Sequence, residues 1–274
     1  MGNISGKIVL VTGSTSGFGR QIAIDLLREG AQVVINGRNK EKLRETEHNL
    51  VNQGWKVITV QGDVTRPEDC QKMVEICIKE YGRLDILINN AGVGSIGLFR
   101  DTIPEATRMV LETNLFGSIY PSYYALPHII ESHGSIIFIS SLAGIHGLPY
   151  KYSYSMSKMA LTALAQSLRI ELSGSGVHIG IMYVGFLQNG PQKRLISGNG
   201  MRIPAIGTPE RQTMSLEKAS MKVIRAIRKR NSTIVFSFVG KSLYLASRLA
   251  PWLVRNVLSK GMARLKHVYN PEIT

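Results

Sequence analysis

Cysteine is scarce in this chain of 274 residues, which contains only Cys70 and Cys77. The two thiols lie seven residues apart in a segment with the pattern of one helix, too far along its axis to form a disulfide without breaking it. The cysteines have no zinc-binding spacing, and the six histidines never pair at a metal-binding interval beside carboxylates or thiols. The sequence therefore supports neither a disulfide scaffold nor metal catalysis, and a reducing compartment fits it best.

Long hydrophobic runs are absent as well. No uncharged apolar stretch reaches the 18 residues that a membrane-spanning helix needs, and residues 1–7 lack the charged and then apolar pattern of a signal peptide. With 44% hydrophobic residues, the chain is long enough to bury the core of one large domain or two small ones. We therefore expect a globular, cytoplasmic protein.

Acidic residues become rare towards the end of the chain. Residues 1–189 contain 17 Lys and Arg against 16 Asp and Glu, whereas residues 190–274 contain 16 against 3. The formal net charge of +14 thus comes almost entirely from the last third of the chain. Such asymmetry indicates an anionic partner surface, either a membrane or a nucleic acid. Nucleic acid is the weaker candidate, because no platform of aromatic and basic residues for stacking bases is evident.

The chain begins with a strand, a glycine-rich turn and a helix. Residues 7–12 (KIVLVT) are typical of a buried parallel strand, and the apolar stripe of Ile22, Leu26 and Leu27 predicts a helix that ends at Gly30. A turn between such elements can bind phosphate, because helix N-terminal amides point at the anion and glycines let it approach. The residues of this predicted phosphate cradle are Gly13, Ser14, Thr15, Ser16, Gly17, Phe18 and Gly19.

Arg38 lies where a dinucleotide-binding fold presents a side chain to the adenosine ribose. It follows a second predicted strand, residues 32–35, about 20 residues after the first glycines. An aspartate there would accept a hydrogen bond from a free 2′-hydroxyl, whereas a guanidinium suits a 2′-phosphate bidentately. We therefore expect NADP(H) rather than NAD as the cofactor. The alternative is that Arg38 only begins the charged helix predicted over residues 39–53.

Strands and helices continue to alternate along the chain. Further strands are predicted over residues 56–60, 84–88, 135–139, 177–183 and 233–238, and further helices over 67–81, 105–130 and 216–230. Alternation of this kind implies an α/β fold with a doubly wound parallel sheet, whose ligands bind beyond the carboxyl ends of the strands. The residues at two such ends that are candidates for contacting adenine and ribose are Asp63, Val64, Asn90, Ala91 and Gly92.

Tyr154 and Lys158 stand four residues apart on a predicted helix that ends near residue 172, so they share one face. An ammonium beside a phenol lowers the tyrosine pKa from its usual value of about 10, as a general acid/base near neutral pH requires. Taken alone, however, such a pair is far more often an ordinary surface contact. Ser141 precedes Tyr154 by 13 residues at the end of a strand, from where its hydroxyl can approach the phenol.

Asn114 is an amide on the apolar face of the helix predicted over residues 105–130. A buried amide needs hydrogen-bond partners. From the residues alone, a structural hydrogen bond to the loop of the neighbouring strand and a role in the site are equally good interpretations.

Over about residues 5–238 the chain resembles the short-chain dehydrogenase/reductase family. The motifs that carry the resemblance are residues 12–19, Asn90-Ala91-Gly92, Asn114, Ser141, and Tyr154 with Lys158. It implies a seven-stranded Rossmann-type fold and hydride transfer between a nicotinamide and a carbonyl or alcohol. It further implies that Tyr154 is the acid/base, that Ser141 steadies the substrate oxygen, and that Lys158 binds the nicotinamide ribose and lowers the tyrosine pKa. Asn114 would hold a water in the proton relay, and a homo-oligomer is expected.

The segment after the strand at residues 177–183 departs from the family pattern. The family usually has Pro-Gly there and a threonine four residues after that glycine, where this chain has Val184-Gly185 and Asn189. The resemblance still implies that Gly185, the backbone of Leu187 and the Asn189 amide contact the nicotinamide end of the cofactor.

Residues 1–238 are expected to form the dinucleotide-binding catalytic domain. Within it, residues 190–230 form the substrate lid region, whose first part, residues 190–214, is rich in glycine, proline and basic residues and is predicted to be irregular. Ser215 is expected to cap the helix that follows.

Residues 239–274 are expected to form a basic, amphipathic, helical C-terminal extension. Lys241, Arg248 and Arg255 are spaced by seven, which predicts that they share one helical face, and Pro251 predicts two helices or a kink. Apolar and basic faces over residues 241–266 are typical of a helix on an anionic membrane surface, which predicts peripheral membrane association. A dimer or lid helix whose basic face is only solvated explains the pattern equally well.

The sequence therefore predicts an NADP(H)-dependent oxidoreductase that acts on a lipophilic ketone or secondary alcohol, of steroid, sphingoid or acyl type. The alternative is a catalytically quiet NADP-binding sensor or membrane-surface protein on the same fold. The intact Ser141, Tyr154 and Lys158 argue against that alternative.

Overall fold

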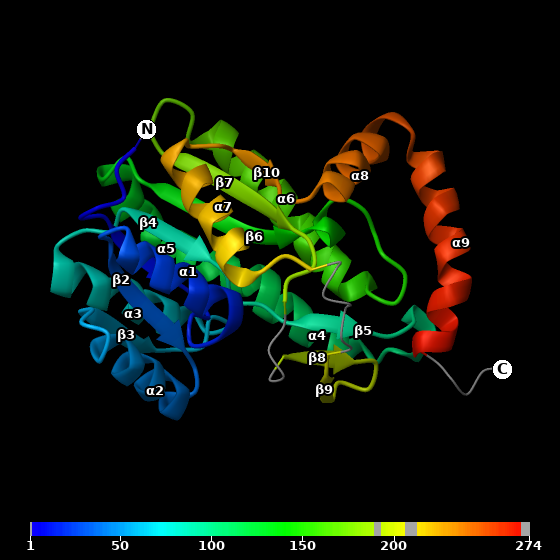
Figure 1. The fold of residues 1–274 in the computed structure, drawn as a ribbon, viewed down its shortest axis with the longest axis horizontal. Coiled ribbons are helices and arrows are strands. Elements are labelled where there is room, and N and C mark those ends of the chain that lie inside the picture. Colours follow the sequence, from blue (N-terminus) through cyan, green and yellow to red (C-terminus); the bar gives the residue numbers. More distant parts are fainter. Residues whose placement is uncertain (1, 189–192, 206–212, 270–274) are drawn as a thin grey trace.

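A parallel sheet forms the centre of the computed structural model, which describes residues 2–188, 193–205 and 213–269, with side chains as far as residue 261 (Figure 1). Its seven strands lie in the order β10-β7-β6-β4-β1-β2-β3, and each neighbouring pair is parallel. The strands are β1 (Ile8–Val11), β2 (Gln32–Gly37), β3 (Val57–Gln61), β4 (Ile86–Asn89), β6 (Ser135–Ser141), β7 (His178–Val184) and β10 (Thr233–Val235). The strand order reverses between β1 and β4, so the carboxyl ends of these two strands flank the usual ligand crevice.

Alternate side chains of each strand point to opposite faces of the sheet, and different helices cover the two faces. On one face Val9 and Val33 belong to a core formed with α1 (Gly17–Arg28), α2 (Lys40–Val51) and α7 (Leu216–Arg228). On the other face Leu10 and Val34 belong to a core formed with α3 (Pro67–Tyr81), α5 (Gly117–Glu131) and α6 (Tyr152–Glu171). The predicted doubly wound α/β fold is confirmed.

Side-chain caps explain where two helices begin. Asn39 accepts a hydrogen bond from the Lys42 backbone N–H at 2.8 Å in front of α2, and Ser215 accepts one from that of Lys218 at 3.3 Å in front of α7. Each cap satisfies an amide that the helix itself leaves unpaired. The predicted cap at Ser215 is therefore confirmed.

The single helix predicted over residues 105–130 is wrong, because a wider turn interrupts it. α4 (Pro104–Leu111) is followed by the π-helical turn η2 (Glu112–Phe116) and then by α5. Asn114 lies in this turn and is fully buried, with its side chain bonded to the backbone of Val93. Turns of this type are frequent at functional sites.

A second, three-stranded sheet lies beside the main one (Figure 1). β8 (Arg194–Ser197) pairs in parallel with β5 (Gly94–Ile96) and antiparallel with β9 (Arg202–Pro204). The prediction that residues 190–214 are irregular is therefore wrong for residues 194–197, which pair with the distant strand β5, and for residues 202–204, which pair with β8. Short 3-10 turns, η1 (Phe99–Asp101) and η3 (Leu142–Gly144), complete the elements around this region.

The last two helices are α8 (Phe238–Leu249) and α9 (Pro251–Tyr269), and α9 lies at the edge of the molecule away from the sheet (Figure 1). The predicted break at Pro251 is confirmed. Lys241 and Arg248 lie on α8 and Arg255 lies on α9, so the prediction that the three share one helical face is wrong. The seventh strand is shorter than predicted, because Ser237 accepts a hydrogen bond from the Gly240 N–H at 3.0 Å and caps α8. None of the described helices is both long and apolar enough to cross a bilayer.

Candidate active site

Gly13, in the turn between β1 and α1, and Gly19, in the first turn of α1, have no space for a side chain. Gly13 has a φ of +62°, and a Cβ added there would lie 2.9 Å from the Cα of Ala91. A Cβ added to Gly19 would lie 2.2 Å from the Asn90 side-chain nitrogen and 2.5 Å from the Gly13 carbonyl oxygen. This segment therefore fits directly against the residues that follow β4.

Two side chains that the sequence analysis did not assign hold this turn in place. The Asn36 side chain accepts a hydrogen bond from the Gly13 N–H at 3.2 Å and donates one to the Gly62 carbonyl at 3.0 Å. The Thr12 hydroxyl accepts from the backbone N–H groups of Asn90 and Ala91, both at 3.0 Å. Loops after three strands are thus fixed to one another before any ligand binds.

The first turn of α1 is suited to an anion. Ser16 and Gly17 are exposed at its start, and within the described residues the Ser16 side chain makes no cap hydrogen bond. The first turn also contains no acidic residue, so its amides are available to a phosphate. The Ser14 side chain has a different role, since it is fully buried and donates to the Val11 carbonyl at 2.7 Å.

Arg38 and Asp63, both predicted to contact the cofactor, meet at the ends of β2 and β3. The guanidinium Nη1 lies 3.3 Å from the Asp63 carboxylate, and the Arg38 side chain is 49% exposed. Burial raises the pKa of Asp63, but hydrogen bonds from Thr65 and the Arg38 charge outweigh it and hold the pKa below the usual value. Arg38 is therefore within reach of solvent and of an incoming anion, beside an ionised carboxylate.

Lys158 lies where the ends of the central strands meet. It is 5% exposed, donates a hydrogen bond to the Ile139 carbonyl at 2.8 Å, and places its Nζ 5.9 Å from the centre of the Tyr154 ring. A Cβ added to Gly92 would lie 3.1 Å from the Asn114 side-chain oxygen and 3.6 Å from this Nζ. Residues from three separate motifs thus converge on one point.

The tyrosine and its serine are also in contact. The Ser141 side chain lies close enough to the Tyr154 phenol to lower the phenol's pKa by hydrogen bonding. The Ser141 oxygen also accepts a hydrogen bond from the Ala143 N–H at 3.3 Å. The Asn114 amide donates to the Val93 carbonyl at 2.9 Å and to the Ser157 hydroxyl at 3.0 Å. The structural interpretation of Asn114 is therefore confirmed, while its role in holding a water stays a prediction.

Comparison with known sequences identifies the family. The sequence profile described as short chain dehydrogenase matches residues 7–198. The chain belongs to the short-chain dehydrogenase family. A relative from Arabidopsis thaliana, 11-beta-hydroxysteroid dehydrogenase 1A, is 39% identical over 202 residues, which are 72% of this chain and 57% of the relative. The chain thus spans little more than half the length of that protein. A second, 11-beta-hydroxysteroid dehydrogenase-like 2, is 32% identical over 263 residues, 93% of this chain and 82% of its own.

Solved structures of short-chain dehydrogenases share the fold. A short-chain dehydrogenase from Streptomyces avermitilis superposes with a TM-score of 0.78 at 26% identity, covering 94% of this chain and 98% of its own. A short-chain dehydrogenase/reductase from Burkholderia phymatum in complex with NAD has a TM-score of 0.80 at 21% identity, covering 92% and 96%. The predicted family membership is confirmed.

One electrostatic prediction for this short-chain dehydrogenase is wrong. Lys158 was expected to lower the pKa of Tyr154, but burial raises that pKa above its ordinary value and outweighs the lowering by the Ser141 hydrogen bond. Burial also lowers the pKa of Lys158 to about 8. Both shifts have the same cause, since a low-dielectric surrounding disfavours the charged form of each group.

The remaining predicted cofactor residues differ in what they offer a ligand. Val64 is 6% exposed and belongs to the core, so its side chain takes no part. On either side of Leu187, the Phe186 carbonyl accepts a hydrogen bond from the Met214 N–H at 2.9 Å, and the Gln188 N–H donates one to the Met214 carbonyl at 3.0 Å. Among the described residues, the N–H and carbonyl of Leu187 itself have no such backbone partner. Gly185 is half-buried at the end of β7, and Asn189 lies outside the described residues.

Proposed function

We propose that this short-chain dehydrogenase is an NADP(H)-dependent oxidoreductase that transfers hydride between the nicotinamide and a lipophilic ketone or secondary alcohol. The observation that carries the proposal is the convergence of Tyr154, Ser141 and Lys158 beside Gly92, next to a glycine turn in which a Cβ would clash. That turn and the uncapped start of α1 fit the pyrophosphate of a dinucleotide. When bound, the cofactor supplies or accepts the hydride.

The side chains of the site divide the remaining chemistry among them. In the reducing direction Tyr154 donates its phenolic proton to the substrate oxygen, and Ser141 donates a hydrogen bond to the same oxygen. Because burial keeps the phenol protonated in the free protein, the acid is ready at neutral pH. Lys158 binds a ribose hydroxyl and, when protonated, places a positive charge beside the phenol as negative charge develops there.

We expect NADP(H) to be preferred because the side chain that follows β2, at the ribose end of the site, is the guanidinium of Arg38 and not a carboxylate. Arg38→Ala is expected to weaken NADPH binding about ten- to a hundredfold, because a hydrogen bond to a charged group contributes about 1.5–3 kcal/mol. NADH binding is expected to change less than about twofold. Fluorescence titration of both cofactors measures this. The control is Arg44→Ala, which removes an exposed arginine from α2, the helix that begins two residues after Arg38. Equal losses for NADPH and NADH would remove the 2′-phosphate role.

An apolar cavity on the helix that carries Tyr154 supports a lipophilic substrate, although Ser141, Tyr154 and Lys158 are not among the residues that line it. It has a volume of about 580 Å³ and lies between the loop that follows Ser141, the outer face of α6, and α9. This volume is typical of small-molecule sites. The apolar residues that line it are Leu148, Pro149, Met156, Met159 and Leu258. The names of the Arabidopsis relatives point the same way, towards a hydroxysteroid or a substrate of similar shape.

A panel of ketones read at the NADPH absorbance tests the proposed function. The panel runs from small and polar to large and apolar, and turnover is expected to rise with apolar size. The competing interpretation, a catalytically quiet cofactor-binding protein, predicts NADPH binding with no consumption by any member of the panel.

We further propose that α8 and the first half of α9 lie on an anionic membrane surface. Phe238, Leu245 and Leu249 are 84%, 60% and 74% exposed and recur on one face of α8, and Trp252 at the start of α9 is 60% exposed. Lys241 follows Phe238 by three residues, and Arg248 follows Leu245 by three. Because a helical turn has 3.6 residues, both cations lie beside the apolar stripe. Exposed apolar and aromatic residues next to cations are characteristic of interfacial helices.

Vesicle binding checks the membrane proposal. The variant Lys241→Glu/Lys260→Glu reverses the charge of one exposed lysine on α8 and one on α9. It is expected to weaken binding to vesicles rich in phosphatidylserine about thirtyfold or more, because each cation near an anionic surface contributes about 1 kcal/mol to binding. Neutral vesicles are expected to bind the wild type weakly. The control is Lys72→Glu on α3, an exposed lysine on another helix. If all three proteins sediment equally with anionic vesicles, the surface has been assigned wrongly.

A further inference from the structure

The first turn of α6, which carries Tyr154, has no cap of its own. A helix leaves its first amides unpaired, and a Ser, Thr, Asp or Asn in front of it normally accepts a hydrogen bond from the second or third of them. The residue in front of α6 is Lys151, whose side chain makes no cap hydrogen bond within the described residues and has no acceptor to offer. The third amide of this helix belongs to Tyr154 itself.

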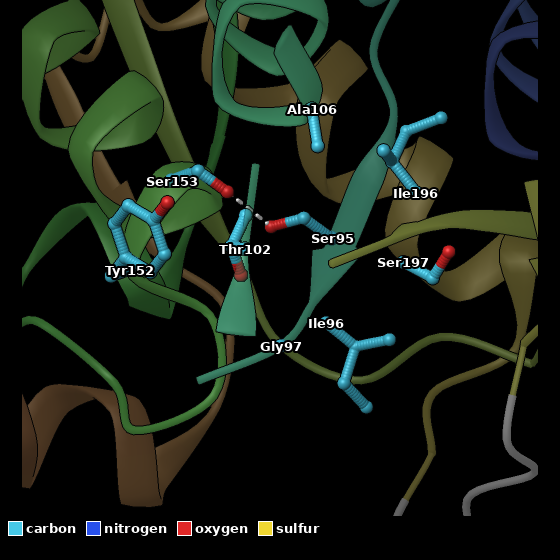
Figure 2. A pocket seen from close by; sticks show the side chains of 9 residues that line it. All are labelled: Ser95, Ile96, Gly97, Thr102, Ala106, Tyr152, Ser153, Ile196 and Ser197. Carbon is cyan, nitrogen blue, oxygen red and sulfur yellow. Dashed lines mark hydrogen bonds between the residues drawn. The ribbon is translucent and has the colours of Figure 1, made fainter. Parts of the chain in front are cut away.

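Ser95 supplies the missing acceptor from a distant strand. The Tyr154 backbone N–H donates to the Ser95 hydroxyl oxygen at 3.2 Å, across 59 residues of sequence. The Ser95 and Ser153 hydroxyls share a second hydrogen bond of 2.7 Å, drawn as a dashed line in Figure 2. Ser95 is 6% exposed and Ser153 3%. One buried hydroxyl thus performs for α6 the task that a helix cap performs elsewhere.

The surroundings make this acceptor hard to replace. Ser95 lies in the middle of β5, where it is in register with Ile196 of β8. Figure 2 shows both residues lining one narrow pocket with Ser153, and this pocket has no space that a water molecule can occupy. Removing the hydroxyl therefore leaves a buried N–H without a partner, which is unfavourable.

We infer that Ser95 is a positioning residue that holds the first turn of α6 so that the Tyr154 phenol meets Ser141. The inference rests on the proposed function. Catalysis is sensitive to such placement, since a shift of about 1 Å in a reacting group can reduce the rate about a hundredfold. Because β5 is also paired with β8, the second sheet holds the tyrosine in position through Ser95.

Two serine variants separate positioning from general stability. Ser95→Ala removes the acceptor for the Tyr154 N–H, whereas Ser153→Ala removes only the hydroxyl pair and leaves that acceptor. Ser95→Ala is expected to lower kcat about ten- to a hundredfold, with NADPH affinity within about twofold of wild type. Ser153→Ala is expected to keep kcat within about threefold. Hydrogen exchange of the Tyr154 amide is expected to accelerate only in Ser95→Ala.

A double variant completes the test. If Ser95 acts through Tyr154, adding Ser95→Ala to Tyr154→Phe lowers kcat little further, because the two changes affect one group. Fully additive losses would overturn the inference, and so would equal kcat in Ser95→Ala and wild type, or equal losses in the two serine variants. A failure of the proposed function is distinguishable, since it would show as an inactive wild type or a Tyr154→Phe variant with unchanged turnover.

Discussion

Tyr154→Phe is expected to lower kcat/KM for ketone reduction about a thousandfold while NADPH affinity stays within about threefold of wild type. A positioned general acid contributes about a hundred- to ten-thousandfold, and the phenylalanine removes the proton without removing the ring. The middle of that range applies because the Tyr154 phenol lies beside the Ser141 hydroxyl. Steady-state rates at the NADPH absorbance, with fluorescence titration of the cofactor, measure both quantities.

Tyr152→Phe is the matched control for this prediction. It removes a phenolic hydroxyl two residues away, which is hydrogen-bonded to the Thr107 hydroxyl at 2.5 Å and lies on the helix face that lines the cavity beside α9. Its kcat/KM is expected to fall less than about tenfold. If the two variants lose activity equally, Tyr154 is not the acid, and the site acts by another route.

Asp85→Ala is expected to destabilise the fold by about 3 kcal/mol. The Asp85 side chain is 2% exposed and accepts hydrogen bonds from the Ile8 N–H at 3.0 Å, from Lys7 at 2.8 Å and from Arg83. Breaking a buried ion pair costs about 3–5 kcal/mol, and the low end applies because both cations are partly exposed and regain water. Urea denaturation followed by circular dichroism gives the free energy of unfolding.

The same carboxylate predicts a pH dependence. Burial raises its pKa, but the hydrogen bonds from Ile8, Lys7 and Arg83 outweigh it and hold the pKa below the ordinary value. A depressed pKa stabilises the fold above the pKa of the unfolded chain, about 3.9, and this stabilisation is lost as the pH falls through the folded value. Wild type and Asp85→Ala are thus expected to converge in stability at strongly acidic pH.

Arg83→Ala removes a half-exposed partner of Asp85 and is expected to lower the free energy of unfolding by less than about 1 kcal/mol at neutral pH. A loss as large as that of Asp85→Ala would contradict the role given to the buried carboxylate.

The seven strands of the main sheet were predictable because each is a short apolar run, and the segments between them have the apolar periodicity of amphipathic helices. β5, β8 and β9 were not, because they have three or four residues each, include Gly94, Arg194 and Arg202, and show no alternation. β5 and β8 pair across about a hundred residues of sequence, so their pairing depends on contacts that no local pattern shows. The π-turn at Asn114 is likewise set by its hydrogen bonds to Val93, which no local pattern shows.

Within the site, the residues of recognisable motifs were predictable and their supports were not. Asn36, Thr12 and Ser95 act through hydrogen bonds to backbone N–H groups far away in the sequence, and no spacing rule indicates such partners. The direction of the Tyr154 pKa was predicted wrongly for a related reason. A neighbouring lysine can be read from the sequence, but the burial that raises the pKa of Tyr154 depends on the whole fold.

The central claim is that the site transfers hydride between NADPH and an apolar carbonyl carbon. The most direct test is to supply NADPH labelled with deuterium at the transferable position of the nicotinamide, together with the ketone that the panel shows to react fastest, and to analyse the product by mass spectrometry. The account predicts one deuterium on the carbinol carbon for each NADPH consumed, and about a thousandfold less labelled product from Tyr154→Phe in the same time. An unlabelled alcohol, or no alcohol from any ketone in the panel, would contradict it.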